Sequence, residues 1–206
     1  MIIAGIDYSL RGPSICIFHG IDAYTGEKVK EFSFKNCSFF FLTDVKKYAN
    51  TFMNNIHGRL ITDVECYSSR YNSISDWAVE VLSKYKCSEV ALEGYSFGSK
   101  GKVFHIAENT GVLKYRLFQE SIPVDIIAPT SIKKFATGKG NADKSGMHDA
   151  FVQETSIDLP HSRKRFLIRY QILLIRIIFV RCFTTELTRN RSNEIIPINI
   201  HSVEHL

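Results

Sequence analysis

The sequence lacks the long apolar runs that membrane-spanning segments require. No uninterrupted apolar run approaches the ~18 residues needed to cross a bilayer, and the N-terminus has no basic stretch followed by the apolar core of a secretory signal. We therefore expect a soluble, cytoplasmic protein with no membrane partner. Internal repeats and low-complexity tracts are also absent. At 206 residues and 45% hydrophobic, the chain can form one domain of about 150 residues plus an appendage.

Paired cysteines are missing as well. The five cysteines are odd in number and scattered, and no two of them form a Cys-x-x-Cys pair. This pattern argues against a disulfide framework and against a zinc knuckle. We expect the cysteines to be reduced thiols.

Acidic residues are scarce at the end of the chain. Residues 159–206 hold eight Lys and Arg against three Asp and Glu, whereas residues 1–158 hold 18 of each kind. The net charge of +5 therefore lies in the last 48 residues, and the body of the protein is neutral. We place a boundary near Asp158, with one domain over residues 1–158 and an atypical basic tail over residues 159–206.

The first 18 residues are typical of a strand, a tight turn and a returning strand. The apolar run before Asp7 is too short for a helix ahead of Gly12 and Pro13, so a central strand is predicted. Asp7 follows this run at the edge of a core, where a lone charge is costly unless it is hydrogen-bonded, paired or bound to a metal. The alternative is that Asp7 caps the turn.

The same pattern recurs in residues 88–94, where an apolar strand ends in Glu93. If the two strands are neighbours in a sheet, Asp7 and Glu93 lie side by side, and paired carboxylates there require a cation or a shared proton. Two basic loops that contain glycine follow, and they are either ordinary surface loops or contacts to phosphates. Their lysines are Lys100, Lys102, Lys139 and Lys144.

The order of the predicted elements indicates an α/β fold with a mixed five-stranded sheet flanked by helices. The elements are three strands within residues 1–42, a helix from a cap at 43–44 through 54, a helix over 76–86, a strand over 88–94, a helix over 103–120, a strand over 123–128, and helices that begin at 129 and just after 141–143. Ser73 or Ser75 is expected to cap the second helix, and Phe104 is expected to point inward from the third.

Four motifs in this order resemble those of RuvC-type Holliday junction resolvases of the bacteriophage branch. They are Gly-Ile-Asp-Tyr-Ser at residues 5–9, Val-Ala-Leu-Glu-Gly at 90–94, Ala-Pro-Thr-Ser-Ile-Lys-Lys at 128–134 and Thr-Gly-Lys-Gly-Asn-Ala-Asp-Lys at 137–144. The resemblance covers residue 1 to about residue 155. It implies an RNase H-like fold, a homodimer, and cleavage of four-way DNA junctions.

The resemblance also implies a metal-dependent mechanism. Members of that family hold Mg²⁺ or Mn²⁺ with four carboxylate-type ligands, two of which map onto Asp7 and Glu93. Two ions about 4 Å apart would activate a water and stabilise the leaving 3′ oxygen in an in-line displacement at phosphorus, and Lys144 would neutralise charge there. Further lysines would hold the DNA backbone without reading sequence. These are Lys100, Lys102, Lys133, Lys134 and Lys139.

The last motif of that family, two acidic residues spaced Asp-x-x-Asp, is missing after Asp158, and residues 163–182 contain no acid at all. Shifting the reading frame by one base over residues 168–177 gives, with permitted codons, a segment that contains Asp-x-x-Asp. We therefore hypothesise that the tail is frameshifted or misassembled. The alternatives are a natural basic C-terminal helix that binds DNA or a membrane surface, or replacement ligands. The candidate replacements are Asp143, Asp149 and Glu154.

Three functions follow from these observations. The leading hypothesis is a structure-selective DNA endonuclease that acts on branched DNA. The second is a junction-binding protein that keeps the fold and the basic loops without cleaving. The third is another RNase H-like nuclease, which acts on RNA–DNA hybrids or flaps.

Overall fold

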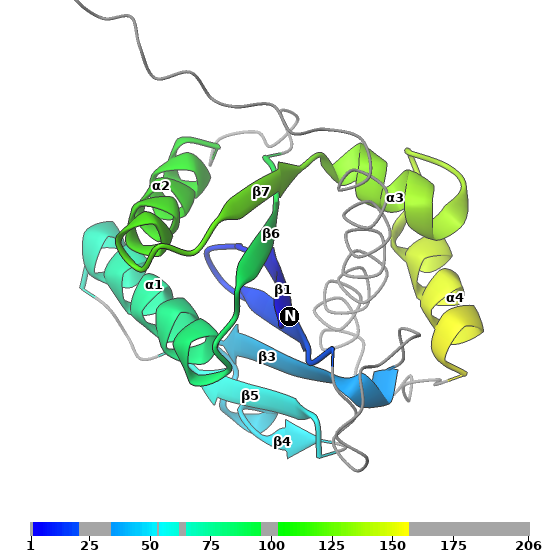
Figure 1. The fold of residues 1–206 in the computed structure, drawn as a ribbon, viewed down its shortest axis with the longest axis horizontal. Helices are drawn as coiled ribbons and strands as arrows, with labels where there is room; N and C mark the ends of the chain where they lie inside the picture. The colour runs from blue at the N-terminus through cyan, green and yellow to red at the C-terminus, as the bar shows by residue number, and fades with distance from the viewer. Residues whose placement is uncertain (1, 21–33, 53, 62–64, 96–102, 157–206) are drawn as a thin grey trace, which may run out of the picture.

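A mixed sheet of seven strands forms the centre of the computed structural model, which describes residues 2–20, 34–52, 54–61, 65–95 and 103–156. The strands are β1 (Ile3–Asp7), β2 (Ser14–Phe18), β3 (Cys37–Thr43), β4 (Thr51–Phe52), β5 (Ile56–Leu60), β6 (Glu89–Glu93) and β7 (Val124–Ile127). The helices are α1 (Tyr67–Lys84), α2 (Val103–Gln119), α3 (Pro129–Thr137) and α4 (Lys144–Thr155), with 3-10 turns η1 (Phe34–Asn36) and η2 (Lys46–Tyr48). Figure 1 shows α1 and α2 on one side of the sheet and α3 and α4 on the other.

The strand order in the sheet is β4-β5-β3-β2-β1-β6-β7. Strands β1, β2 and β3 form an antiparallel meander, whereas β6 lies parallel to β1 and β7 lies parallel to β6. The predicted α/β class with a mixed sheet is confirmed. The sheet has two strands more than the predicted five, because β5 adds parallel to β3 and the two-residue β4 closes that edge.

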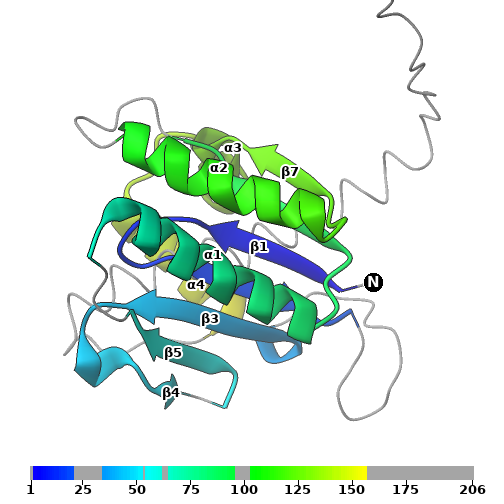
Figure 2. The same ribbon diagram turned by 90° about the vertical axis from the view of Figure 1, so that its left-hand side faces the viewer.

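The largest hydrophobic core lies between the sheet and helices α1 and α2. Buried residues of β1 and β6, including Ile6 and Leu92, share one cluster with Leu82 of α1 and Leu113 of α2. Figure 2 shows the two helices running side by side across the sheet, and both begin at the edge where β1 ends. On the opposite face, Phe151 of α4 packs with β2 and β3 residues in a second cluster.

Helix α1 begins earlier than the sequence predicts. Its N-cap is Cys66, whose sulfur accepts a hydrogen bond from the backbone N–H of Ser69, while the Ser69 hydroxyl accepts one from the Cys66 N–H. The predicted caps, Ser73 and Ser75, lie inside the helix, and the Ser75 hydroxyl donates to the Asn72 carbonyl at 2.9 Å. The prediction was wrong because cysteine is not among the residues that usually cap helices.

The helix predicted to end at Asn54 is also absent. That segment instead forms η2, then β4, then a turn at Asn54, whose φ of 60° is left-handed. The side chain of Asn55 donates to the carbonyls of Phe34 and Cys37 at 3.2 and 3.1 Å. These hydrogen bonds to residues far away in sequence hold the turn against the start of β3, and local helix propensity does not encode them.

Two further expectations have clear outcomes. Helix α2 matches the predicted range to within one residue, but Phe104 is 78% exposed, so its predicted inward orientation is wrong. Among the described residues, Cys16, Cys37, Cys66 and Cys87 form no disulfide with one another, in agreement with the predicted thiols. In the part of the chain that the structure describes, no helix is long and apolar enough to span a bilayer.

We predict that Gly58→Ala destabilises the fold. An added Cβ at this position in β5 would lie 2.5 Å from the Tyr48 carbonyl oxygen and 2.6 Å from Cζ of Phe41, and the backbone atom cannot move aside cheaply. Overpacking of this kind costs about 1–3 kcal/mol in the free energy of unfolding, which urea denaturation measures. The control is Gly146→Ala in α4, where the added Cβ meets no atom closer than 3.5 Å. Equal stability of the two variants would contradict the prediction.

Candidate functional site

Two carboxylates lie at the same edge of the sheet. Asp7 is the last residue of β1 and Glu93 is the last residue of β6. These strands are parallel neighbours, and Ile6 is paired with Leu92, so the two acidic residues follow at equivalent positions. Backbones of adjacent strands are about 4.8 Å apart. The predicted juxtaposition of Asp7 and Glu93 is therefore present in the structure.

Both carboxylates project to the side of the sheet where α3 and α4 lie. Ile6 and Leu92 point into the core under α1 and α2, and side chains alternate between the two faces of a strand. On the other face, Ile132 of α3 packs against Ile3 of β1. Asp7 and Glu93 are each half-buried there, which favours hydrogen bonds or a cation over simple hydration.

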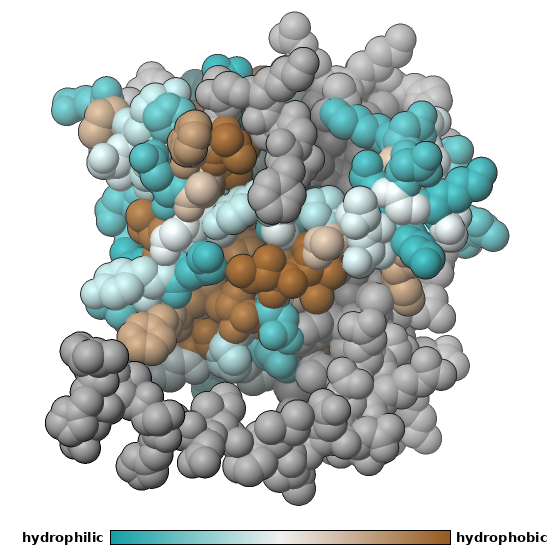
Figure 3. All heavy atoms as spheres, turned by 90° about the horizontal axis from the view of Figure 1, so that it is seen from above, coloured by the Kyte–Doolittle hydropathy of each residue, from teal (hydrophilic) through white to brown (hydrophobic). Residues whose placement is uncertain are grey.

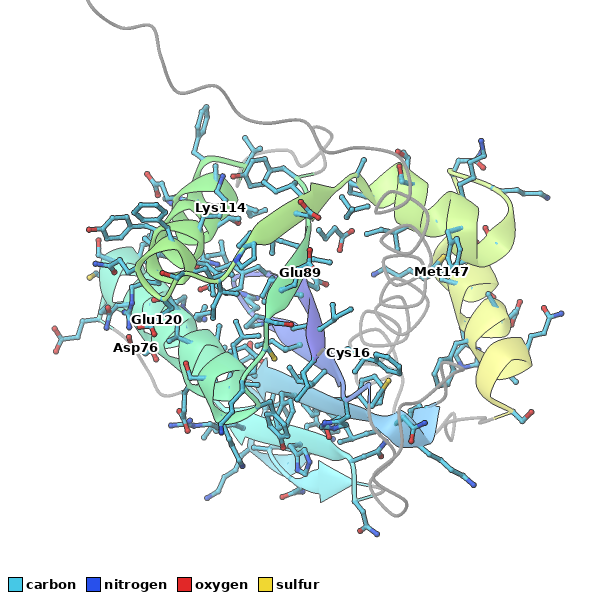
Figure 4. The ribbon with its side chains drawn as sticks, in the orientation of Figure 1. Cys16, Asp76, Glu89, Lys114, Glu120 and Met147 are labelled. Carbon is cyan, nitrogen blue, oxygen red and sulfur yellow. The ribbon has the colours of Figure 1, made fainter. Side chains whose placement is uncertain are left out.

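Side chains in the stick view confirm the two faces. Figure 4 shows Met147 on the side of α4 that faces the sheet and Cys16 on the facing side of the sheet, whereas Asp76, Lys114 and Glu120 belong to the α1 and α2 layer. Met147 is only 1% exposed and Cys16 is fully buried. Cys16 is the cross-strand partner of Gly5, so it lies on the same face of the sheet as Asp7.

Ser14 is a polar neighbour that the sequence analysis did not single out. It is the cross-strand partner of Asp7 in the antiparallel pair of β1 and β2, so the two side chains lie on the same face. Ser14 is 1% exposed, and its hydroxyl has no hydrogen-bond partner within the described residues. The register is symmetric about Leu10 and Arg11 rather than about Gly12 and Pro13, the residues that mark the turn in the sequence, so the turn signal alone does not pair Ser14 with Asp7.

Lys144 is the first residue of α4, and the preceding Asp143 caps the helix. The Asp143 carboxylate accepts a hydrogen bond from the Gly146 N–H at 2.9 Å, which confirms Asp143 as the N-cap. Lys144 is exposed, and it lies two helical turns before the buried Phe151. The packing of Phe151 against β2 and β3 therefore anchors the helix that carries Lys144.

The other predicted DNA-contacting lysines fall into two groups. Lys133 and Lys134 are on α3, and Lys139 follows the helix after Gly138, which adopts a left-handed φ of 76°. Hydrophilic residues gather on this side of the molecule in Figure 3. Lys100 and Lys102 lie outside the described residues. The structure thus places three of the five lysines on or beside α3.

Of the candidate replacement ligands, Asp143 and Asp149 form no metal-holding group with the acidic pair among the described residues. The Asp143 carboxylate is used in the helix cap, and Asp149 is 79% exposed, with its Oδ1 3.8 Å from Nδ1 of His148. The side chain of Glu154 lies outside the described part. Across residues 2–20, 34–52, 54–61, 65–95 and 103–156, no three His, Cys, Asp or Glu side chains are grouped closely enough to hold a metal ion.

The chemistry of the two carboxylates fits a hard divalent cation. Mg²⁺ and Mn²⁺ prefer oxygen ligands and are commonly held by one or two carboxylates together with water and phosphate oxygens. Asp7 and Glu93 supply two such groups on one face of the sheet. They are half of the four-ligand set that the sequence resemblance implies.

Comparison with known proteins gives a consistent result. The family model described as crossover junction endodeoxyribonuclease RuvC matches residues 42–159, a range that includes Glu93 and Lys144 and begins after Asp7. The crossover junction endodeoxyribonuclease RuvC of Corynebacterium diphtheriae is 31% identical over 81 residues, which are 39% of this chain and 50% of that protein. The alignment therefore spans half the length of this curated relative.

Two solved structures share the fold. The structure of Thermus thermophilus RuvC matches with a TM-score of 0.57 at 18% identity, covering 89% of this chain and 98% of that chain. The structure of T. thermophilus RuvC in complex with Holliday junction substrate matches with a TM-score of 0.54 at 16% identity, covering 89% and 97%. The RNase H-like fold that the sequence predicts is confirmed.

We predict that Asp143→Ala lowers the free energy of unfolding by about 1 kcal/mol, because the first turn of α4 loses its side-chain cap. Urea denaturation measures the loss. Asp149→Ala is the matched control, since this carboxylate is on the same helix and is 79% exposed. If both variants unfold at the same urea concentration, the cap does not stabilise the helix that carries Lys144.

Proposed function

Because the chain belongs to the RuvC family of crossover junction endodeoxyribonucleases, we propose that it resolves Holliday junctions and other branched DNA by metal-dependent phosphodiester hydrolysis. The observation that carries this proposal is the placement of Asp7 and Glu93 at the ends of adjacent parallel strands. The bacteriophage origin, and the cytoplasm of a host cell as the location, remain predictions from the sequence.

The residues of this chain have separate tasks in the proposed reaction. Asp7 and Glu93 would hold Mg²⁺ or Mn²⁺, in a pair of ions that would supply the Lewis acidity for activating water and stabilising the leaving oxygen. Lys144 at the start of α4 offsets negative charge on the scissile phosphate. Other lysines hold the flanking DNA backbone, which positions the strand without reading its sequence. These are Lys100, Lys102, Lys133, Lys134 and Lys139.

We propose that the remaining metal ligands are encoded after residue 158, in a segment that is frameshifted in this chain. The family model stops matching at residue 159, next to the boundary predicted from the loss of acidic residues. In the alternative function, the chain binds junctions without cutting them. The observation behind this alternative is that no third acidic side chain is grouped with Asp7 and Glu93 within the described residues.

We further propose that the protein is a homodimer that pairs through α2. Phe104, Tyr115 and Phe118 are spaced 11 and 3 residues apart and lie on one stripe of the helix. Tyr115 is 62% exposed, and Phe104 and Phe118 are each 78% exposed. Gly111 falls on the same stripe, and no atom lies within 4 Å of the position of its Cβ, so a second helix can approach closely. Large exposed aromatic side chains gathered in this way mark an interaction surface.

We predict that Asp7→Asn abolishes cleavage and leaves junction binding intact. Cleavage of a synthetic four-way junction in Mg²⁺ or Mn²⁺ should fall by about 10²–10³-fold or more, because the substitution removes a cation ligand. Junction affinity in Ca²⁺ should stay within about twofold, since backbone contacts provide binding. Glu120→Gln, which neutralises one exposed carboxylate at the end of α2, is the control and should cut normally. Unchanged cleavage by Asp7→Asn would refute the role of Asp7.

The same assay separates the proposals for the tail when it is run on two proteins. One is this chain, and the other carries the reframed sequence in place of the last 48 residues. Cleavage by the reframed protein alone supports both the endonuclease and the frameshift. Cleavage by this chain shows that the tail is genuine and sends the search for ligands to Glu154 and to the tail itself, because Asp143 and Asp149 form no metal-holding group with the acidic pair among the described residues. Binding without cleavage by either protein supports the junction-binding alternative.

We predict that Phe118→Asp converts the dimer to a monomer in analytical ultracentrifugation. A buried aromatic anchor at the centre of an interface typically contributes at least about 2 kcal/mol, and a charge there adds a desolvation cost. The control is Phe135→Asp on α3, a phenylalanine that is 43% exposed and lies away from α2. A dimer that survives Phe118→Asp would show that this stripe is not the interface.

A further inference from the structure

A cavity of about 480 Å³ lies near the acidic pair, but neither Asp7 nor Glu93 is among the residues that line it. The β1–β2 turn contributes Ser9 and Arg11, the start of α1 contributes Tyr67 and Arg70, and α2 contributes Ile106. Because Ser9 is two residues after Asp7, the cavity and the acidic pair meet at the same edge of the sheet. Its volume lies within the range of about 300–1,000 Å³ that small-ligand sites occupy.

Two guanidinium groups line this cavity. Nη1 of Arg70 donates to the Leu10 carbonyl at 3.0 Å, which fixes the arginine against the β1–β2 turn. Arg11 is exposed in the same turn, and Glu65 is the single acidic residue among the described residues of the lining. The described lining therefore carries a net positive charge. The planar guanidinium group of arginine can donate two parallel hydrogen bonds to phosphate oxygens, so these two arginines favour a phosphate group as ligand.

The aromatic wall of the cavity is held in a fixed orientation. The ring of Tyr67 stacks on His105 with a centroid distance of 3.9 Å and an interplanar angle of 9°, and Tyr67 remains 48% exposed. Nδ1 of His105 lies 2.9 Å from the Tyr71 hydroxyl, which donates to Glu108 at 2.9 Å. Burial and the Glu108 carboxylate raise the pKa of Tyr71 to about 12, so this hydroxyl keeps its proton at neutral pH.

We propose that this cavity binds one unpaired nucleotide, with its phosphate at Arg11 and Arg70 and its base against Tyr67 and Ile106. The combination of a cationic rim with an aromatic and apolar wall suits a ligand that carries both a phosphate and a flat ring. If the nucleotide is part of the DNA strand that is cleaved at Asp7 and Glu93, this inference rests on the proposed function. A free nucleoside monophosphate carries the same phosphate and base, so it is the second ligand that the cavity fits.

Cys66 provides a reporter of occupancy inside the cavity. It lines the cavity and is exposed, whereas Cys16, Cys37 and Cys87 are buried. Hydrogen bonds from the backbone and side chain of Ser69 lower the pKa of the Cys66 thiol, which favours the reactive thiolate. Alkylation by iodoacetamide, followed by mass spectrometry of the peptide that contains Cys66, therefore measures access to the cavity.

The experiment measures the rate of Cys66 alkylation in the full chain with Ca²⁺ in place of Mg²⁺. The probes are a four-way junction, a fully paired duplex of the same sequence, and thymidine 5′-monophosphate. Fluorescence anisotropy first establishes that each DNA is bound at saturation. We expect the junction to slow alkylation by at least about fivefold and the duplex by less than about twofold, because only unpaired nucleotides can enter the cavity.

The variants distinguish occupancy from simple shielding. Arg11→Gln should lose the protection at saturating junction, while Lys84→Gln should keep it. Lys84 is an exposed residue at the other end of α1, about 25 Å from Tyr67 by the helical rise. Tyr67→Ala should lose protection without losing a charge, which separates base stacking from electrostatics.

The outcomes test the nucleotide-binding site and the proposed function separately. If the junction binds and neither it nor thymidine 5′-monophosphate slows alkylation, the nucleotide site is overturned while the junction-binding part of the proposed function stands. Protection by the mononucleotide alone supports the cavity and assigns it a free nucleotide. If the junction does not bind at all, the proposed function fails. The effect of thymidine 5′-monophosphate on Cys66 alkylation then shows whether the cavity binds a nucleotide.

Discussion

The parallel pairing of β1 with β6 is the constraint on which the site depends. Ile6 and Leu92 are fully buried and opposite each other, so this pairing is fixed by the core under α1 and α2. Asp7 and Glu93 then fall on the other face at the same edge. A slip of one residue in either strand would turn a carboxylate into the core and an apolar side chain out of it. The fold and the placement of charge are therefore set by the same register.

The same register creates an electrostatic demand, because it places two carboxylates side by side. Two carboxylates on strands about 4.8 Å apart repel each other unless a cation or a proton lies between them. Helix α4 brings Lys144 at its first position, and Asp143 is committed to capping that helix. The buried Phe151 anchors the helix to β2 and β3. The position of Lys144 at the start of α4 thus depends on the apolar packing of Phe151 further along the same helix.

The carboxyl edge of the sheet is where the site on one face and the cavity on the other come together. On one face are the acidic pair and the lysines of α3, and on the other face the arginine-lined cavity opens between the β1–β2 turn and α1. In the proposed function, a DNA strand that crosses this edge contacts both. The aromatic stripe on α2 stays exposed on the outer surface of its layer, which leaves it available to a second subunit.

The sequence by itself determined the elements whose signals are local. Apolar runs that end in an acidic residue predicted β1 and β6, helical periodicity predicted α2, and Asp143 was recognised as a possible cap, so the fold class and both acidic residues followed. Only the tertiary structure decided that β1 and β6 are neighbours, that β4 and β5 replace a predicted helix, and that Ser14 lies beside Asp7. No sequence pattern predicted the cavity next to that edge either. Each of these features depends on contacts between residues far apart in the chain, which no local pattern of propensity or charge can specify.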